Sequence, residues 1–329
     1  MRYYSFVVLI LCLCMSSAVL AEVGLWQLKS APKSKGETDL LLQLDIEQMA
    51  EGLQQAANEQ SLITLPLPDG SYKKVTVQVT QTLSITLQQK FPNVRTYKVL
   101  SDDAIVVGRI DLSPAGFHAM LHTATGKIAY IDPITDVADQ EEQQQEQNMY
   151  HSYWEAEPDD NMPEIKAKRG DTHQCALVHD HAADADYNIG EKLQKNSGFI
   201  SDSAVHKYRL AVSATGEYTA QHGGTKATAL AAIASTINRI NHIYERDAAI
   251  HFELVDNNDQ LIFTDSRNDP FYGNVDDFLQ QNQTLITNII GSDYYDVGHL
   301  FTTKGGGVAL VGGACRTNVK AMGVSGYPA

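Results

Sequence analysis

Hydrophobic and polar residues alternate with a period of two through much of residues 62–133, which is the pattern of half-buried β-strands. The clearest alternation is Tyr72–Val79, which follows a turn signal at residues 68–70. Such segments, each separated by a turn, predict an antiparallel sheet with one face on a core. The other predicted strands are residues 62–67, 104–110, 117–121 and a return strand that ends at Ile131.

The periodicity changes in the second half of the chain. Apolar residues recur at helical spacing after Thr225 and again after Asn274, and both residues are good helix N-caps. Gly291 is expected to end the second helix. Strand patterns flank these helices at residues 208–213, 249–255 and 296–302. The order strand, helix, strand, helix, strand predicts right-handed crossovers and a parallel sheet.

A fourth extended run, residues 306–312, follows the last of these strands after only a short loop. A short loop cannot make a parallel crossover, so this run is expected to lie antiparallel at the sheet edge. The fold class predicted for the whole chain is α+β. A β-rich first part, residues 22–135, precedes an α/β part at residues 206–329 with three parallel strands, one antiparallel edge strand and two helices.

Between these two parts lies a polar, acidic stretch, residues 136–205, which is expected to be an exposed linker. A basic cluster at Lys166–Gly170 interrupts it. This cluster indicates either a processing site or an ordinary solvated linker.

The first 21 residues have the features of an export signal. Arg2 precedes a short apolar run at Phe6–Leu13, and the small residues Val19 and Ala21 give a cleavage pattern. The apolar run is too short to span a bilayer, so a membrane anchor is the less favoured interpretation. The expected location is secreted, either extracellular or periplasmic, with no membrane association after signal cleavage.

Composition narrows the range of partners. Hydrophobic residues make up 43% of the chain and charged residues 20%, as in a globular protein. The formal net charge of −15 disfavours nucleic acid and anionic membranes, because both bind clustered Lys and Arg. Outside the signal segment the only cysteines are Cys175 and Cys315, which could form one disulfide in an oxidising compartment.

Several segments of the second half together resemble the reprolysin-type metallopeptidases, in their bacterial branch. A weaker likeness to the propeptides of that family covers residues 117–154. The segments that carry the resemblance are Tyr208–Thr219, Asn241–Asp247, Tyr295–His299, Gly305–Ala309 and Lys320–Gly326.

The resemblance implies a zinc-dependent endopeptidase that acts on protein or peptide substrates. In the family, a helix with the pattern H-E-x-x-H holds Zn²⁺ and activates a water molecule. The sequence contains no H-E-x-x-H. The chain is therefore expected to be a precursor that is cut short before that helix. By itself it is expected to be inactive and to bind no zinc, whereas the complete enzyme would use Zn²⁺.

The resemblance also implies a substrate-binding strand. In the family the edge strand borders the active-site cleft, and an extended peptide pairs with its free backbone groups. The alternative is a glycine-rich connector with no ligand role. The residues that correspond to the strand are Gly306, Gly307, Val308, Ala309, Leu310 and Val311.

Cys175 is a candidate latency residue. In reprolysin precursors a propeptide cysteine can occupy the open position on zinc, and a thiolate is a strong zinc ligand. The glycine that usually follows this cysteine in the family is Ala176 here. Two alternatives stay open, namely a Cys175–Cys315 disulfide and a bond from Cys315 to a cysteine outside this sequence.

Other residues have less specific signals. Some reprolysins bind calcium through an acidic residue on the first strand, where this chain has Arg209, so no calcium site is expected there. His179 and His181 are expected to be solvated rather than metal ligands, and His299 to be a buried histidine with a hydrogen-bond partner. Ser325 lies in Gly-Val-Ser-Gly, which departs from the nucleophile-elbow pattern, so a serine hydrolase is disfavoured. The second hypothesis is an exported, non-catalytic binding or interaction protein with a peptidase-like sheet.

Overall fold

The structure of the chain is a computed structural model that describes residues 24–30, 39–59, 61–101, 106–134, 148–156, 175–178 and 205–326. The expected signal peptide and most of the expected linker, including Lys166–Gly170, His179 and His181, lie outside these residues. The chain divides into two compact units that are discontinuous in sequence. The first unit comprises residues 1–78, 97–110 and 116–156, and the second comprises residues 79–96, 111–115 and 157–329.

The first unit is built on a nine-stranded sheet with the strand order β1-β2-β9-β8-β7-β6-β5-β4-β3. One long helix, α1 (Ile46–Glu59), buries Met49, Leu53 and Ala56 at helical spacing. The strands are β1 (Trp26–Ser30), β2 (Leu40–Leu44), β3 (Ile63–Pro66), β4 (Tyr72–Val79), β5 (Arg95–Leu100), β6 (Val106–Ser113), β7 (Gly116–Thr123), β8 (Ile128–Pro133) and β9 (Met149–Trp154).

Antiparallel pairing is present where the alternating pattern predicts it. Strand β3 pairs antiparallel with β4, and β7 pairs antiparallel with β8. The aromatic rings of Trp26, Phe117 and Tyr150 pack edge to face, with ring centroids 5.6 to 6.4 Å apart.

Residues 149–154 differ from the linker expected at 136–205. They form β9, which lies between β2 and β8 in the sheet and buries Tyr150 and Ser152. The apolar and aromatic residues of this short strand are surrounded by acidic sequence, which obscures its pattern.

The second unit contains a six-stranded sheet with the order β10-β14-β15-β13-β11-β12. Its strands are β10 (Cys175–Val178), β11 (His206–Ala214), β12 (Ile250–Leu254), β13 (Val297–Thr302), β14 (Gly306–Leu310) and β15 (Gly323–Gly326). Its helices are α2 (Ile85–Lys90), α4 (Gly216–Gln221), α5 (Lys226–Ala248), α6 (Val275–Ile289) and the short 3₁₀ turns η2 (Asn258–Leu261) and η3 (Ser292–Tyr294).

The two long helices begin at the predicted caps. The Thr225 side chain accepts a hydrogen bond from the Thr228 amide, and Asn274 accepts one from the Asp277 amide, each within a capping box. Helix α6 ends at Ile289, and Gly291 follows with φ at +90°, a conformation that glycine adopts without strain.

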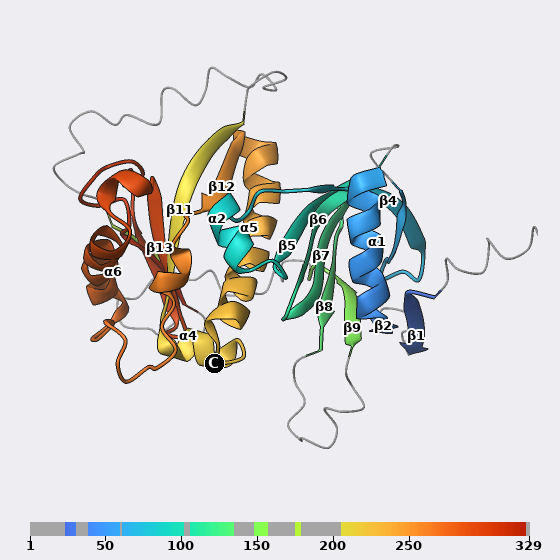
Figure 1. The fold of residues 1–329 in the computed structure, drawn as a ribbon, viewed down its shortest axis with the longest axis horizontal. Coiled ribbons are helices and arrows are strands. Elements are labelled where there is room, and N and C mark those ends of the chain that lie inside the picture. Colours follow the sequence, from blue (N-terminus) through green and yellow to red (C-terminus); the bar gives the residue numbers. More distant parts are fainter. Residues whose placement is uncertain are drawn as a thin grey trace, which may run out of the picture. The chain divides into compact units, whose positions relative to one another are not determined.

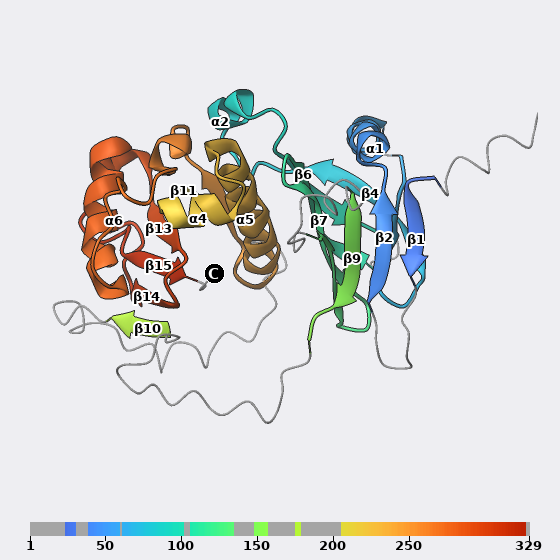
Figure 2. The same ribbon diagram turned by 90° about the horizontal axis from the view of Figure 1, so that it is seen from below.

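The helices cover both faces of the six-stranded sheet. Helix α6 lies on one face, and α5 with α4 lies on the other (Figure 1, Figure 2). Residues Leu230, Ile233 and Ala234 of α5 are fully buried against Val212 of β11. Among the described residues, no helix is long and apolar enough to cross a membrane.

Strands β11, β12 and β13 are parallel, as the strand and helix order predicts. The antiparallel orientation of β14 is also confirmed, but its neighbours differ from the expectation. A fourth parallel strand, β15, lies between β13 and β14, and β10 covers the other side of β14. Strand β14 is therefore not the last strand of this sheet.

Candidate functional site

The candidate site is built around β14, which contains five of the residues that the sequence analysis assigns to substrate binding. Val311, the sixth, lies just beyond the end of the strand. On its inner side β14 pairs antiparallel with β15, with Val308 opposite Val324. On its outer side it pairs in parallel with β10, with Cys175 opposite Gly307 and Val178 opposite Leu310. Figure 2 shows β10 beside β14 at this end of the sheet.

Glycine allows the strands to approach closely here. Gly306 has φ at +97°, a left-handed conformation that is rare for other residues. A Cβ on Gly326, which is opposite Gly306, would lie 1.6 Å from the Lys304 carbonyl oxygen. The turn before β14 therefore fixes both the start of β14 and its register with β15.

Strand β14 contributes one side chain to the core beneath it. Val308 is buried and packs with Leu300, Val324 and Phe278 in one hydrophobic cluster. Its neighbours in the strand are only half-buried. The strand is thus anchored to the domain from one face, while its outer backbone groups face β10.

Polar side chains of α6 hold the segment that leads into β15. The amide group of Asn282 donates a hydrogen bond of 2.7 Å to the Ala321 carbonyl, and Gln283 accepts one of 2.7 Å from the Ala321 amide. Asn282 is fully buried and also accepts a hydrogen bond from Ser213 of β11. Buried polar groups of this kind stabilise only when they are paired, so they specify one position for the strand.

A cavity of about 390 Å³ lies beside the end of β15. Burial raises the pKa of Tyr218 and lowers that of His222, so it favours the neutral form of both side chains. The residues that line this cavity include Tyr218, His222, Phe301, Thr302, Ser325 and Gly326.

His299 and Ser325 are brought together across β13 and β15. The His299 Nε2 atom lies 2.9 Å from the Ser325 Oγ atom, and desolvation lowers the pKa of His299. Nucleophilic serine sites also need a group that orients the histidine. In the part of the chain that the structure describes, no carboxylate bonds to the His299 ring. The pair is therefore a cross-strand hydrogen bond. His299 has the expected partner, but its side chain is half-buried rather than buried.

The described residues do not supply a zinc site. Nowhere in residues 24–30, 39–59, 61–101, 106–134, 148–156 and 205–326 do three His, Cys, Asp or Glu side chains converge on one point. A structural zinc site needs four such ligands, and a catalytic site needs three. The residues present therefore do not fit a bound zinc ion, and no catalytic step is assigned to them. The side chain of Cys175 lies outside the described atoms.

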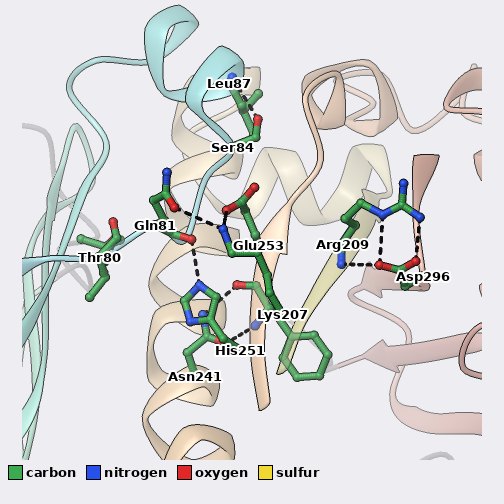
Figure 3. A network of polar contacts seen from close by, with 12 residues as sticks. Thr80, Gln81, Ser84, Leu87, Lys207, Arg209, Asn241, His251, Glu253 and Asp296 are labelled. Carbon is green, nitrogen blue, oxygen red and sulfur yellow. Dashed lines mark hydrogen bonds and ion pairs between the residues drawn. The ribbon is translucent and has the colours of Figure 1, made fainter. Parts of the chain in front are cut away.

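Arg209, at whose position the sequence analysis expects no calcium site, lies on β11. Its guanidinium donates to both carboxylate oxygens of Asp296, at 3.0 and 2.7 Å (Figure 3). It also donates to the Asp293 carbonyl at 2.6 Å. The hydrogen bonds from Arg209 hold the pKa of Asp296 below its usual value. The positive Arg209 side chain therefore binds the oxygen atoms of Asp293 and Asp296, and position 209 supplies no carboxylate.

Cys315 is an exposed free thiol, and its φ is +63°. Its amide donates a hydrogen bond of 2.8 Å to the Asp296 carbonyl. The structure therefore does not contain the Cys175–Cys315 disulfide that the sequence left open.

The second unit is thus an α/β domain with a mixed sheet. One strand of this sheet, the glycine-rich β14, is antiparallel to its inner neighbour and pairs on its outer side with residues 175–178. Residues 204–329 match the family model described as metallo-peptidase family M12B, reprolysin-like. This match supports the assignment of the second part of the chain to a reprolysin-like metallopeptidase family, which is zinc-dependent in general. Comparison with curated proteins gives no match to the chain.

Sequence reasoning missed the two strands that flank β14. Strands β10 and β15 have four residues each, too few to establish alternation. The only signal for β15 is that Gly323–Gly326 lies within a segment that resembles the family. No signal indicates the pairing of residues 175–178.

Proposed function

We propose that this chain belongs to the precursor of an exported zinc-dependent endopeptidase, and that β14 is the strand on which an extended protein or peptide substrate pairs. The observation that carries this proposal is the pairing of β14 with residues 175–178, an extended segment of the same chain. The family match of residues 204–329 supplies the reaction class, which is peptide-bond hydrolysis. Export rests on the signal-peptide pattern in residues 1–21.

Strand addition explains how β14 can recognise many sequences. An added strand is held by main-chain hydrogen bonds, and side-chain pockets then give specificity. A substrate strand needs the same outer backbone groups of β14 that β10 occupies. Residues 175–178 and substrate therefore compete, and the precursor is latent while this segment is in place.

Cys175 lies within the competing segment, opposite Gly307. We propose that in the complete enzyme the Cys175 thiolate blocks zinc, since a soft thiolate is a strong zinc ligand. The chain as printed above is proposed to bind peptides without hydrolysing them. This blocking role is what the resemblance to reprolysin precursors implies for Cys175.

A non-catalytic binding protein is the alternative. It would use the same edge of the sheet, but no longer form of the protein would hydrolyse peptides. Finding an H-E-x-x-H helix shortly after Ala329 in the gene, within roughly 10 to 25 residues for a short loop, favours the peptidase. A continuation without paired histidines favours the binding protein.

The edge assignment is tested by replacing residues 175–178 with Gly-Ser-Gly-Ser in the full chain. A labelled synthetic peptide that copies residues 172–181 should bind this variant about 10-fold or more tighter than it binds the unchanged chain, because no intramolecular strand competes. A control of equal length replaces residues 142–145 of the polar linker with the same Gly-Ser-Gly-Ser and should leave peptide affinity unchanged. Equal affinity for the two variants would rule out β14 as the competing edge.

The disulfide alternative has its own test. Cys315 should react with a maleimide in the native, unreduced chain, because its thiol is free and exposed. A peptide linked through Cys175 and Cys315 in unreduced mass spectra would overturn latency through Cys175.

A further inference from the structure

The opposite end of the six-stranded sheet, at β12, is also covered by a segment from the N-terminal part of the chain. This docking segment, residues 79–96, connects β4 to β5 and belongs to the second compact unit. Leu83 forms a parallel bridge with Leu254 of β12. The Ser84 amide donates to the Leu254 carbonyl at 2.9 Å, and the Leu254 amide donates to the Thr82 carbonyl at 2.8 Å. The docking segment thus adds a short strand to the β12 edge.

Apolar side chains of the docking segment complete the core of the domain. Leu83, Leu87 and Val94 are 2%, 0% and 1% exposed and share one cluster with Val212 and Leu230. Burying such side chains is favourable because it removes their apolar surface from water. The three residues therefore act as core residues of the peptidase-like domain, although they lie more than a hundred positions earlier in sequence.

Helix α2 sets which side chains enter that core. The Ser84 side chain caps the helix by accepting a hydrogen bond of 3.2 Å from the Leu87 amide. Leu87 then faces inward, whereas Ile85 on the same helix is 65% exposed. These two positions provide a matched pair for mutation.

Polar contacts surround the apolar ones. The Gln81 carbonyl lies 2.9 Å from Nε2 of His251 (Figure 3). The Nδ1 atom of His251 is 2.7 Å from Glu245. Lys207 donates to the Gln81 side chain at 3.2 Å and to Glu253 (Figure 3). The residues that make these contacts lie on β11, α5 and β12. The docking segment is therefore held by polar contacts on three elements of the domain as well as by apolar burial.

We infer that the outer edge of β12 and α5 form a binding site for the docking segment. This site holds the segment by noncovalent contacts even when the chain that joins it to the domain is cut. If the chain is cut between residues 157 and 204, the N-terminal fragment stays bound through residues 79–96. None of the contacts above uses a residue from the cut region. Such a cut therefore does not release the N-terminal fragment, and release of that fragment is a second, separate event. This inference goes beyond the proposed function, because it needs neither zinc nor peptidase activity.

The test inserts a specific protease site after Ala167 in the full chain and cleaves the protein after it has folded. The two fragments should co-elute in size-exclusion chromatography and appear as a 1:1 complex in native mass spectrometry. Burial of the apolar residues named above and the strand pairing at β12 predict that the fragments stay associated at micromolar concentration. Fragments that separate at micromolar concentration without denaturant would overturn the inference.

Variants locate the binding to the docking segment. Leu87→Asp should raise the Kd on the order of 100-fold or more, because it places a carboxylate in an apolar core. Ile85→Asp, on the exposed side of the same helix, should leave co-elution unchanged. Equal behaviour of the two variants would contradict the inference.

A second pair remains informative if Leu87→Asp fails to fold before cleavage. Ser84→Ala removes the helix cap but keeps the amide that donates to Leu254. Ser84→Pro also removes that amide, and the Ser84 φ of −57° is compatible with proline. Weaker fragment binding by Ser84→Pro than by Ser84→Ala supports strand addition at β12, and equal binding contradicts it.

Discussion

The two ends of the six-stranded sheet are covered by segments of the same chain in different ways. At β12 the docking segment inserts buried leucine and valine side chains into the domain core and adds one bridge to the sheet. At β14, residues 175–178 pair along the strand in a continuous four-residue register. The first arrangement depends on side-chain burial, which is specific to one sequence. The second depends on backbone pairing, which any extended peptide can imitate.

This difference separates a fixed attachment from an exchangeable one. A ligand that fills a core leaves a cavity when it is removed, and the cost of such cavities is several kcal/mol. A strand paired at an edge can be replaced by another strand that makes the same main-chain hydrogen bonds. We therefore expect β14 to be the recognition edge and β12 to be the structural edge.

The largest expected effect is at the β12 end. Leu87→Ala should lower the free energy of unfolding of the intact chain by about 2–5 kcal/mol, because a fully buried leucine leaves a cavity. Ile85→Ala, at a position that is 65% exposed, should change it by no more than about 0.5 kcal/mol. Urea denaturation followed by circular dichroism measures both. A small effect of Leu87→Ala would mean that the docking segment is not part of the core.

A smaller and more local effect is expected at the β14 end. Gly326→Ala places a Cβ 1.6 Å from the Lys304 carbonyl oxygen, so the turn and the β14–β15 register must shift. We expect a loss of about 1–3 kcal/mol and faster amide exchange in β14, with no change at β12. Gly52→Ala in α1, where a Cβ meets nothing within 4 Å, is the control and should not destabilise the chain. Exchange that increases equally at both edges would show that the edges are not independent.

An acid-dependent effect is expected next, at the Arg209–Asp296 pair. Because Arg209 lowers the pKa of Asp296, the pair stabilises the fold above the unfolded-chain pKa of about 3.9. That stability is lost as the pH falls through the lower, folded-state pKa. Both side chains are partly exposed, at 45% and 24%, so Asp296→Asn should cost only about 1 kcal/mol at neutral pH. In thermal melts the difference from the unchanged chain should shrink below pH 4, and a difference that grows with acid would contradict this account.

The smallest expected effect concerns a surface contact of the docking segment. Lys90 donates to Asp259 at 3.1 Å, but its side chain is 40% exposed. Lys90→Gln should lower stability by about 0.2–1 kcal/mol, and salt should reduce the difference further. A loss above about 2 kcal/mol would indicate that charge, rather than apolar burial, holds the docking segment.

Much of the second unit could be predicted from sequence because its signals are local. Thr225 and Asn274 are the caps of α5 and α6, and three strands lie where the apolar runs predict them. Strands β10 and β15 could not be predicted, because four residues carry no periodicity and their pairing is set by distant partners.

The docking segment was missed for a related reason. Leu83 and Leu87 lie within a part of the chain whose pattern is that of an antiparallel sheet, and nothing local shows which core they enter. At the candidate site the resemblance predicts that residues 306–311 bind substrate, but the segment that pairs with the outer edge of β14 emerged only from the structure.

The most direct test of the account compares amide hydrogen exchange at the two edges of the full chain. The synthetic peptide that copies residues 172–181 is added in excess, and exchange is followed by mass spectrometry. We expect residues 175–178 to exchange faster when the peptide displaces them. Residues 306–310 and the Ser84 and Leu254 amides should stay protected. Unchanged exchange at residues 175–178 with a bound peptide, or loss of protection at Leu254, would contradict the assignment of β14 as the recognition edge.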